Sequence, residues 1–146
     1  MTTILLPFHE LSPVQLYDIL RLRSEVFVVE QNCVFLDMDN KDQVAMHLMI
    51  YKNEKLVAYT RLFDKGQYYA ETSIGRVVVC PSSRSLKIGQ YVMIESIAAI
   101  KKIFNETTIR IGAQCYLLKF YQSFGFSVNG DLYVEDGIDH IEMLLE

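Results

Sequence analysis

The sequence contains no tryptophan and little proline, glycine or cysteine. Three prolines and seven glycines among 146 residues form no linker-like stretch, so we expect a single domain over residues 1–146. The three cysteines, an odd number at unrelated spacings, favour neither a disulfide framework nor a zinc site. We therefore expect reduced thiols, a cytoplasmic protein and no bound metal.

Long apolar runs and an excess of positive charge are absent as well. No run approaches the roughly 18 apolar residues that a membrane helix needs. The first ten residues, MTTILLPFHE, lack the basic start of a signal peptide. The net charge is −4, and the Lys and Arg residues are scattered along the chain. We expect neither a membrane nor a nucleic acid as partner.

The apolar residues, 51% of the chain, are spaced in a way that predicts three helices. Ser12-Pro13 is typical of a helix start, and the helix that follows is predicted to reach Glu30. A second helix is predicted over about 88–104. A third, shorter one is predicted over 114–124, closed by Gly125.

Strands are predicted between these helices, at residues 2–6, 44–51, 55–63, up to Cys80, 107–111 and 132–145. The last of these is a hairpin that turns at Asp136-Gly137. The order is strand, helix, antiparallel strands, helix, strand, helix and hairpin. It indicates an α/β protein with a mixed sheet and helices on its faces.

The segment VVVCPSSRSLKIGQ (residues 77–90) is a strand, a polar loop and a helix start. Such a junction can hold a phosphate, because the first N–H groups of a helix are unpaired and its dipole is positive there. The segment has neither the P-loop pattern nor the three glycines of a Rossmann turn. Ser85 to Gln90 can supply N–H donors, Arg84 and Lys87 positive charge, and Gly89 close backbone approach.

This segment resembles the loop of the GNAT superfamily of N-acetyltransferases, Gln/Arg-x-x-Gly-x-Gly/Ala. Arg84 stands at its first position and Gly89 at its last, while Lys87 replaces the middle glycine. A second segment, QCYLLKFYQSFGF, resembles the family's Asn-x-x-Ala…Tyr-x-x-x-Gly-Phe pattern. Its matching residues are Gln114 in place of Asn, Tyr121, Gly125 and Phe126.

Most of the chain resembles one branch of that superfamily, the ElaA-like proteins. The resemblance rests on LRSEVFVVEQNC, GAQ, FYQSFGF and EDGIDHIEM (residues 22–33, 112–114, 120–126 and 135–143). It implies the GNAT acyl-CoA N-acyltransferase fold, with a mostly antiparallel central sheet flanked by helices. It also implies an acetyl-CoA-dependent N-acetyltransferase, with acetyl-CoA as co-substrate. The resemblance names no acceptor, which could be a small-molecule or a peptide amine.

The resemblance also implies roles for individual residues. The backbone of Val77, Val78 and Val79 would bind the pantetheine arm, and Gln114 would hydrogen-bond it or its neighbourhood. Tyr121 would act as general acid and protonate the departing thiolate. The pyrophosphate would be wrapped by the loop residues Arg84, Ser85, Leu86, Lys87, Ile88, Gly89 and Gln90.

The resemblance assigns no general base directly, because the two positions where relatives carry a Glu match Ser73 and Ile109. Glu71 shares a strand face with Ser73. We therefore expect a water relay from Glu71 past Ser73.

Other polar residues are candidates for the acceptor site or for structural roles. Glu30 and Gln31, at the end of the first helix, are candidates for the acceptor site. His47 and His140 are interpreted as structural histidines, although His140 could line the acceptor side. LDMDNKD (residues 36–42) lacks the ligand pattern of a calcium loop and is interpreted as a solvated acidic loop that could attract a cationic amine.

Two other functions stay open. The missing Glu at both usual base positions and Lys87 in the loop are compatible with a non-catalytic sensor or scaffold that binds acetyl-CoA. LRSEVF followed by an acidic loop is faintly similar to acyl-homoserine-lactone synthases, although those chains are longer. Related folds often dimerise through sheet edges, so a homodimer is a further expectation.

Overall fold

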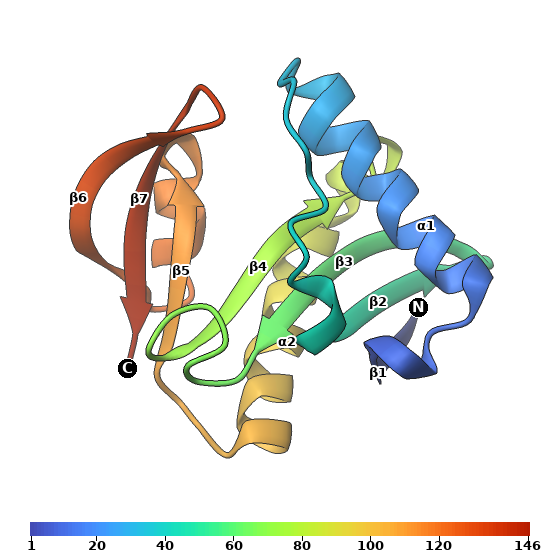
Figure 1. The fold of residues 1–146 in the computed structure, drawn as a ribbon, viewed down its shortest axis with the longest axis horizontal. Coiled ribbons are helices and arrows are strands. Elements are labelled where there is room, and N and C mark those ends of the chain that lie inside the picture. Colours follow the sequence, from blue (N-terminus) through green and yellow to red (C-terminus); the bar gives the residue numbers. More distant parts are fainter.

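A seven-stranded sheet runs through the computed structural model, which describes residues 1–146 (Figure 1). The strand order is β1-β2-β3-β4-β5-β7-β6, and only β4 and β5 run parallel. The predicted mixed, mostly antiparallel sheet is therefore confirmed. The strands are β1 (Thr2–Pro7), β2 (Met46–Lys52), β3 (Lys55–Phe63), β4 (Thr72–Val79), β5 (Ile109–Gln114), β6 (Ser127–Glu135) and β7 (Ile138–Leu145).

Three α-helices accompany the sheet: α1 (Pro13–Arg23), α2 (Ile88–Phe104) and α3 (Leu118–Gln122). Ser12 caps α1 as predicted, since its side chain accepts from the Gln15 N–H while the Gln15 side chain accepts from the Ser12 N–H. The predicted helix does continue to Glu30, but its last seven residues wind as a π-helix, η2 (Ser24–Glu30). None of these helices is long and apolar enough to cross a bilayer.

Several predicted boundaries lie at or close to their expected positions. The helix predicted over 88–104 is found as α2, and the turn at Asp136-Gly137 has positive φ at both residues (53° and 76°), as a two-residue hairpin turn needs. The strand predicted at 107–111 lies at 109–114 instead. The strand predicted from residue 44 begins at Met46, because 42–44 form a 3-10 turn, η3 (Asp42–Val44).

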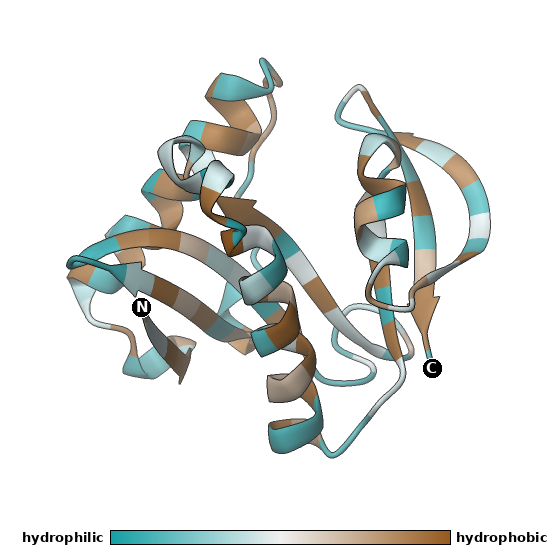
Figure 2. Ribbon diagram, turned by 180° about the vertical axis from the view of Figure 1, so that it is seen from behind, coloured by the Kyte–Doolittle hydropathy of each residue, from teal (hydrophilic) through white to brown (hydrophobic).

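The sheet separates two apolar cores. On one face, Ile19, Leu22 and Val26 of α1 and η2 pack on Met49 and Tyr59 of the central strands. On the other face, a larger cluster joins α2 and α3 to β2, β3 and β5. Figure 2 shows strongly apolar stretches along the central strands and α2, and a more polar ribbon at the edge strand β6.

The parallel strands β4 and β5 pair only at their beginnings. Thr72 and Ser73 pair with Ile109 and Arg110, and no further residues of the two strands pair. A bulge follows in β4, where Arg76 has a φ of 48° and the register against β3 shifts. A bulge bends the strand that carries it. Beyond it the two strands diverge (Figure 1), which leaves the inner edge of β4 without a partner strand.

The acidic segment 36–42 is not the solvated loop that the sequence predicted. Asp37 and Asp42 are buried, and their carboxylates bind the guanidinium group of the fully buried Arg23 at 2.8 and 2.7 Å. Arg61 binds Asp39 and Asp42 at 2.6 and 3.0 Å, and Arg76 binds Asp37 at 2.8 Å. Three arginines thus neutralise three aspartates, and the segment offers no free acidity to a cationic amine.

Candidate active site

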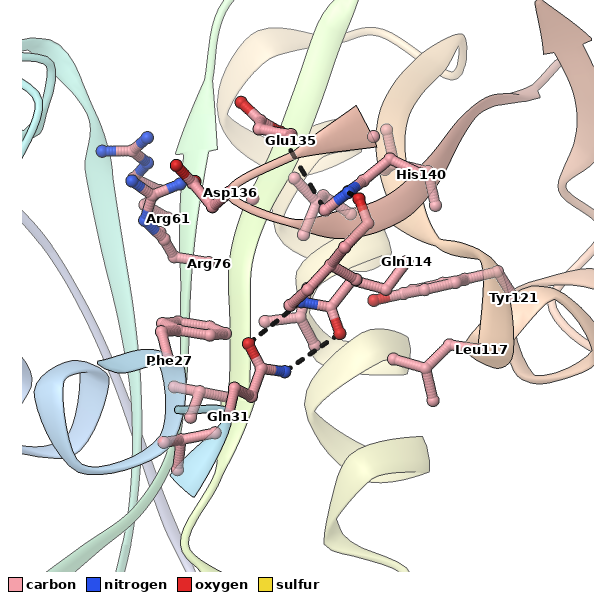
Figure 3. A pocket seen from close by; sticks show the side chains of 18 of the residues that line it. Phe27, Gln31, Arg61, Arg76, Gln114, Leu117, Tyr121, Glu135, Asp136 and His140 are labelled. Carbon is pink, nitrogen blue, oxygen red and sulfur yellow. Dashed lines mark hydrogen bonds and ion pairs between the residues drawn. The ribbon is translucent and has the colours of Figure 1, made fainter. Parts of the chain in front are cut away.

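A cavity of about 720 Å³ occupies the gap between β4 and β5. Its walls come from η2, β3, β4, the start of α2, β5, α3 and the β6–β7 hairpin. The cavity therefore exists because the two central strands diverge after two paired residues. Figure 3 shows side chains from both halves of the sheet meeting in it. The structure holds no cluster of His, Cys, Asp and Glu suited to a metal ion.

The predicted pantetheine strand lines this cavity. Val77, Val78 and Val79 are all part of the wall, and Val78 is buried with the α1-side core. On the outer side, β4 pairs with β3 through Tyr59–Val78 and Ala58–Val79. On the cavity side no strand pairs with these residues. Backbone groups of this segment that point toward β5 are thus open to a ligand with amide groups of its own.

The predicted phosphate loop forms a 3-10 turn, η4 (Pro81–Leu86), followed by Lys87 and the start of α2. Lys87 has a φ of 57°, so the left-handed conformation that favours glycine is present although the residue is lysine. No side chain caps α2, which leaves the first N–H groups of a 17-residue helix open to an anion.

The loop residues differ in where their side chains lie. Arg84 and Gly89 line the cavity. Ile88 is buried in the core at 1% exposure and can offer only its backbone. Solvent-exposed side chains extend from Ser85, Leu86, Lys87 and Gln90.

Two side-chain contacts join the end of η2 and the residue after it to other parts of the cavity wall. Arg84 binds both carboxylate oxygens of Glu30 at 2.6 and 2.8 Å, and this bond lowers the pKa of Glu30. The amides of Gln31 and Gln114 bind each other at 3.0 and 3.3 Å across the gap (Figure 3). The predicted acceptor candidates Glu30 and Gln31 thus contact two predicted cofactor residues, Arg84 and Gln114.

Tyr121 projects from α3 into the cavity and is only 6% exposed. Burial raises the pKa of its phenol, with a smaller contribution from Tyr116. The phenol is therefore neutral and holds its proton at physiological pH. The same lack of water destabilises any other anion formed beside it, including a thiolate.

The predicted base relay is only half present. Ser73 lines the cavity and is buried, but Glu71 is not part of the wall. Both carboxylate oxygens of Glu71 bind Arg110, at 2.9 and 3.0 Å. Because these hydrogen bonds lower the pKa of Glu71, its carboxylate is a weaker base than a free one. The structure thus corrects the assignment of Glu71, which is a partner of Arg110.

The sequence did not reveal two tyrosines, Tyr69 and Tyr133, whose hydroxyl groups lie close to Gly112 of β5. A methyl group at Gly112 would lie 2.6 Å from the Tyr133 hydroxyl and 3.0 Å from the Tyr69 hydroxyl. Burial raises the pKa of both phenols, that of Tyr133 to about 12. The residues GAQ contain this glycine, but only the fold brings Tyr69 and Tyr133 to it.

The two interior histidines have different surroundings. His47 is fully buried, and its ring nitrogens contact the Tyr59 hydroxyl at 2.7 Å and the Asp42 carbonyl oxygen at 2.8 Å. The interpretation of His47 as structural is therefore confirmed. His140 instead lines the cavity, on β7 directly opposite Gln114 of β5.

The comparisons with known proteins agree with this geometry. Residues 19–146 match the family model of the acetyltransferase (GNAT) domain. The chain belongs to the GNAT acetyltransferase family. Over 139 residues it is 42% identical to the protein ElaA of Escherichia coli. The aligned residues cover 94% of this chain and 91% of that protein.

Solved structures of the GNAT fold match over nearly the whole chain. The crystal structure of an acyl-CoA N-acyltransferase from Pseudomonas aeruginosa has a TM-score of 0.94 at 33% identity and covers 100% of both chains. That of Escherichia coli ElaA has a TM-score of 0.92 at 39% identity and covers 99% of each. The predicted family, branch and fold are thereby confirmed, and family and fold together support an acyl-CoA-dependent acyltransferase.

Proposed function

We propose that this protein is an acetyl-CoA-dependent N-acetyltransferase that transfers acetyl directly to the amine of a small molecule or peptide. The observation that carries the proposal is the cavity between the diverging strands β4 and β5. It combines an unpaired strand edge, a helix N-terminus without a cap and a buried phenol.

The two ends of acetyl-CoA suit different parts of this site. The free edge of Val77–Val79 matches the amide groups of the pantetheine arm, and the open N–H groups at the start of α2 match the pyrophosphate. The Arg84 guanidinium group would bind a phosphate of acetyl-CoA, either in place of the Glu30 carboxylate or together with it. Gln114 would contact the pantetheine region, next to its present partner Gln31.

Tyr121 is the proposed general acid of the reaction. When the amine forms the C–N bond and the C–S bond breaks, the electron pair moves to sulfur, which needs a proton. The Tyr121 phenol is neutral, buried and part of the cavity wall. Tyr121 is thus a proton donor of the cavity wall that stays protonated at physiological pH and has little contact with water.

A transfer assay tests the proposal. Purified protein is incubated with acetyl-CoA and a panel of primary amines that includes phenethylamine, spermidine and a short peptide, and the released thiol is followed with time. Amine-dependent thiol release is expected, and mass spectrometry should find the acetylated amine. Tyr121→Phe should lower kcat by about 100-fold, within the range of general acid catalysis, while acetyl-CoA binding stays unchanged.

The matched control is Tyr17→Phe, since Tyr17 is an exposed tyrosine on α1 outside the cavity. If acetyl-CoA binds and no amine is acetylated, the non-catalytic sensor is the better description. If acetyl-CoA does not bind at all, the proposed function is wrong.

A further inference from the structure

His140 is a polar side chain in the wall of the cavity. It lies on β7, is 8% exposed, and shares a sheet face with Gln114 across the β5–β7 pair. In Figure 3, His140 points into the cavity from β7 and Tyr121 points into it from α3, next to Gln114. The two residues thus reach the same cavity from different elements.

The contacts of His140 determine which ring nitrogen carries the hydrogen. Nδ1 lies 2.7 Å from the carbonyl oxygen of Ile138. A carbonyl oxygen can only accept, so Nδ1 must donate. In the neutral ring, Nε2 then has a free lone pair, which is the state that a proton acceptor needs. The Tyr133 ring stacks on the imidazole with centroids 5.5 Å apart and holds its orientation.

Nε2 has a carboxylate close by but not bonded to it. Glu135 Oε2 lies 3.9 Å from Nε2, beyond hydrogen-bond distance. At this separation the carboxylate leaves the lone pair of the neutral ring free. A histidine that gains a proton during a reaction benefits from such a neighbour.

The other ionisable groups of the cavity wall are poorer proton acceptors. Glu30 is bound to Arg84, and Arg61 and Arg76 are cations. Tyr68 and Tyr69 are phenols whose pKa burial raises further. Asp136 and Glu135 are exposed carboxylates whose negative charge water stabilises.

We propose that His140 is the general base of this protein, an inference that rests on the proposed function. As a neutral amine attacks the thioester carbonyl, Nε2 of His140 accepts one proton from the amine nitrogen. The C–N bond forms, the C–S bond breaks, and sulfur takes a proton from Tyr121. His140 ends as imidazolium and Tyr121 as phenolate, and a proton that passes from one to the other through water restores both.

The electrostatic surroundings of His140 come from three elements. Tyr133 and Glu135 face it from β6, and Tyr116 lies on η5 (Cys115–Leu117), which packs against β7. On β7 itself, Glu142 is bound to Arg110 at 3.0 Å. Glu135 is the carboxylate that approaches His140 Nε2, at 3.9 Å.

The test compares wild type, His140→Gln and His9→Gln, with acetyl-CoA and whichever panel amine the transfer assay finds active. His9 is the matched control because its side chain is 80% exposed and outside the cavity. We expect His140→Gln to lower kcat/KM by about 100-fold, within the range for a general base. The pH profile of kcat/KM should lose the contribution of the histidine on its acidic side and keep only that of amine protonation, while acetyl-CoA binding by calorimetry stays within twofold.

A second variant separates catalysis from a merely structural effect. His140→Ala leaves space at the ring position, and free imidazole added to the assay should restore a measurable part of its activity. Added imidazole should not change the activity of His9→Gln.

The inference is overturned if His140→Gln keeps the wild-type kcat/KM and pH profile, or if it loses activity only through loss of acetyl-CoA binding. A wild type that transfers no acetyl to any amine would instead refute the proposed function, and the inference with it.

Discussion

Lys87 is the residue at which the loop before α2 becomes a helix, and its backbone carries an unfavourable conformation. Its φ of 57° costs a residue with a Cβ roughly 1 kcal/mol. The side chain is exposed and lies next to the uncapped N-terminus of α2. The backbone of Lys87 therefore lowers the stability of the folded protein. Its side chain places a positive charge where we expect the phosphates of acetyl-CoA.

Replacing Lys87 separates these two effects. Lys87→Gly should raise the free energy of unfolding by up to about 1 kcal/mol, because glycine adopts this conformation freely. It should also weaken acetyl-CoA binding a few-fold, since one cation is lost. Lys87→Ala is the control, with the same loss of affinity and no gain in stability. Chemical denaturation and calorimetry measure the two effects. Tighter binding by Lys87→Gly would show that the lysine side chain obstructs the phosphates.

Gly112 is the second residue whose identity the structure explains. Gly112→Ala should destabilise the protein by about 1–3 kcal/mol, because its methyl group would lie 2.6 Å from the Tyr133 hydroxyl. Adding Tyr133→Phe should recover part of this loss by removing that oxygen. Gly75→Ala is a suitable control, since a methyl group there meets nothing closer than 3.9 Å. Equal stability of Gly112→Ala and wild type would contradict the steric argument.

At the scale of elements, the arginine–aspartate network attaches segment 36–42 to α1, β3 and β4. Burial by itself raises the pKa of Asp42, but the hydrogen bond and charge of Arg23 and the charge of Arg61 outweigh it and lower the pKa below its usual range. The pKa of Asp39 is lowered in the same way, mainly by Arg61. Both carboxylates thus stay ionised in the folded protein to lower pH than free aspartates do.

This network predicts an acid-sensitive stability. A carboxyl group with a depressed folded-state pKa contributes stability above its unfolded pKa, near ~3.9, and loses it as pH falls toward the folded value. Asp42→Asn should cost about 3–5 kcal/mol at pH 7, because Arg23 and Arg61 lose a buried charged partner. It should also flatten the decline in stability below about pH 4. Urea unfolding at several pH values measures both.

The control for this prediction is Asp131→Asn, since Asp131 is an exposed aspartate on β6 without an ion pair. It should leave the pH dependence unchanged. If Asp42→Asn were as stable as wild type at pH 7, the network would contribute little to holding the segment.

At the scale of the whole molecule, the sheet has two parts that are joined weakly at its centre. β1 to β4 form one part and β5 to β7 the other, with two paired residues of β4 and β5 between them. Other connections include α2, the shared core and side-chain contacts such as Gln31–Gln114 and Glu71–Arg110. A ligand in the cavity would contact both parts at once.

Acetyl-CoA should therefore raise the melting temperature. At a hundred times its dissociation constant a ligand adds about 2.7 kcal/mol, which for a chain of this length amounts to several degrees. ATP and NAD are the controls and should shift the midpoint much less, since neither has a pantetheine arm. Equal shifts with all three would mean that only the phosphate site binds. No shift at millimolar acetyl-CoA would contradict the proposed site.

Local sequence patterns determined the elements and the family. Ser12-Pro13 and Asp136-Gly137 act through contacts within a few residues, so a helix start and a hairpin turn could be predicted from them. The strand–loop–helix segment and the Tyr-x-x-x-Gly-Phe pattern are also local, and they were sufficient for the resemblance that the comparisons confirmed.

Only the tertiary structure decided which polar side chains work together. Arg110 lies 39 residues from Glu71 in the sequence, and its contact with Glu71 removes that carboxylate from the proposed relay. The aspartates of segment 36–42 find Arg61 and Arg76 on β3 and β4, and His140 meets Gln114 through the β5–β7 pairing. Such partners follow from strand order and register, because charge and hydrogen bonding act over a few ångströms in space, whatever the separation along the chain.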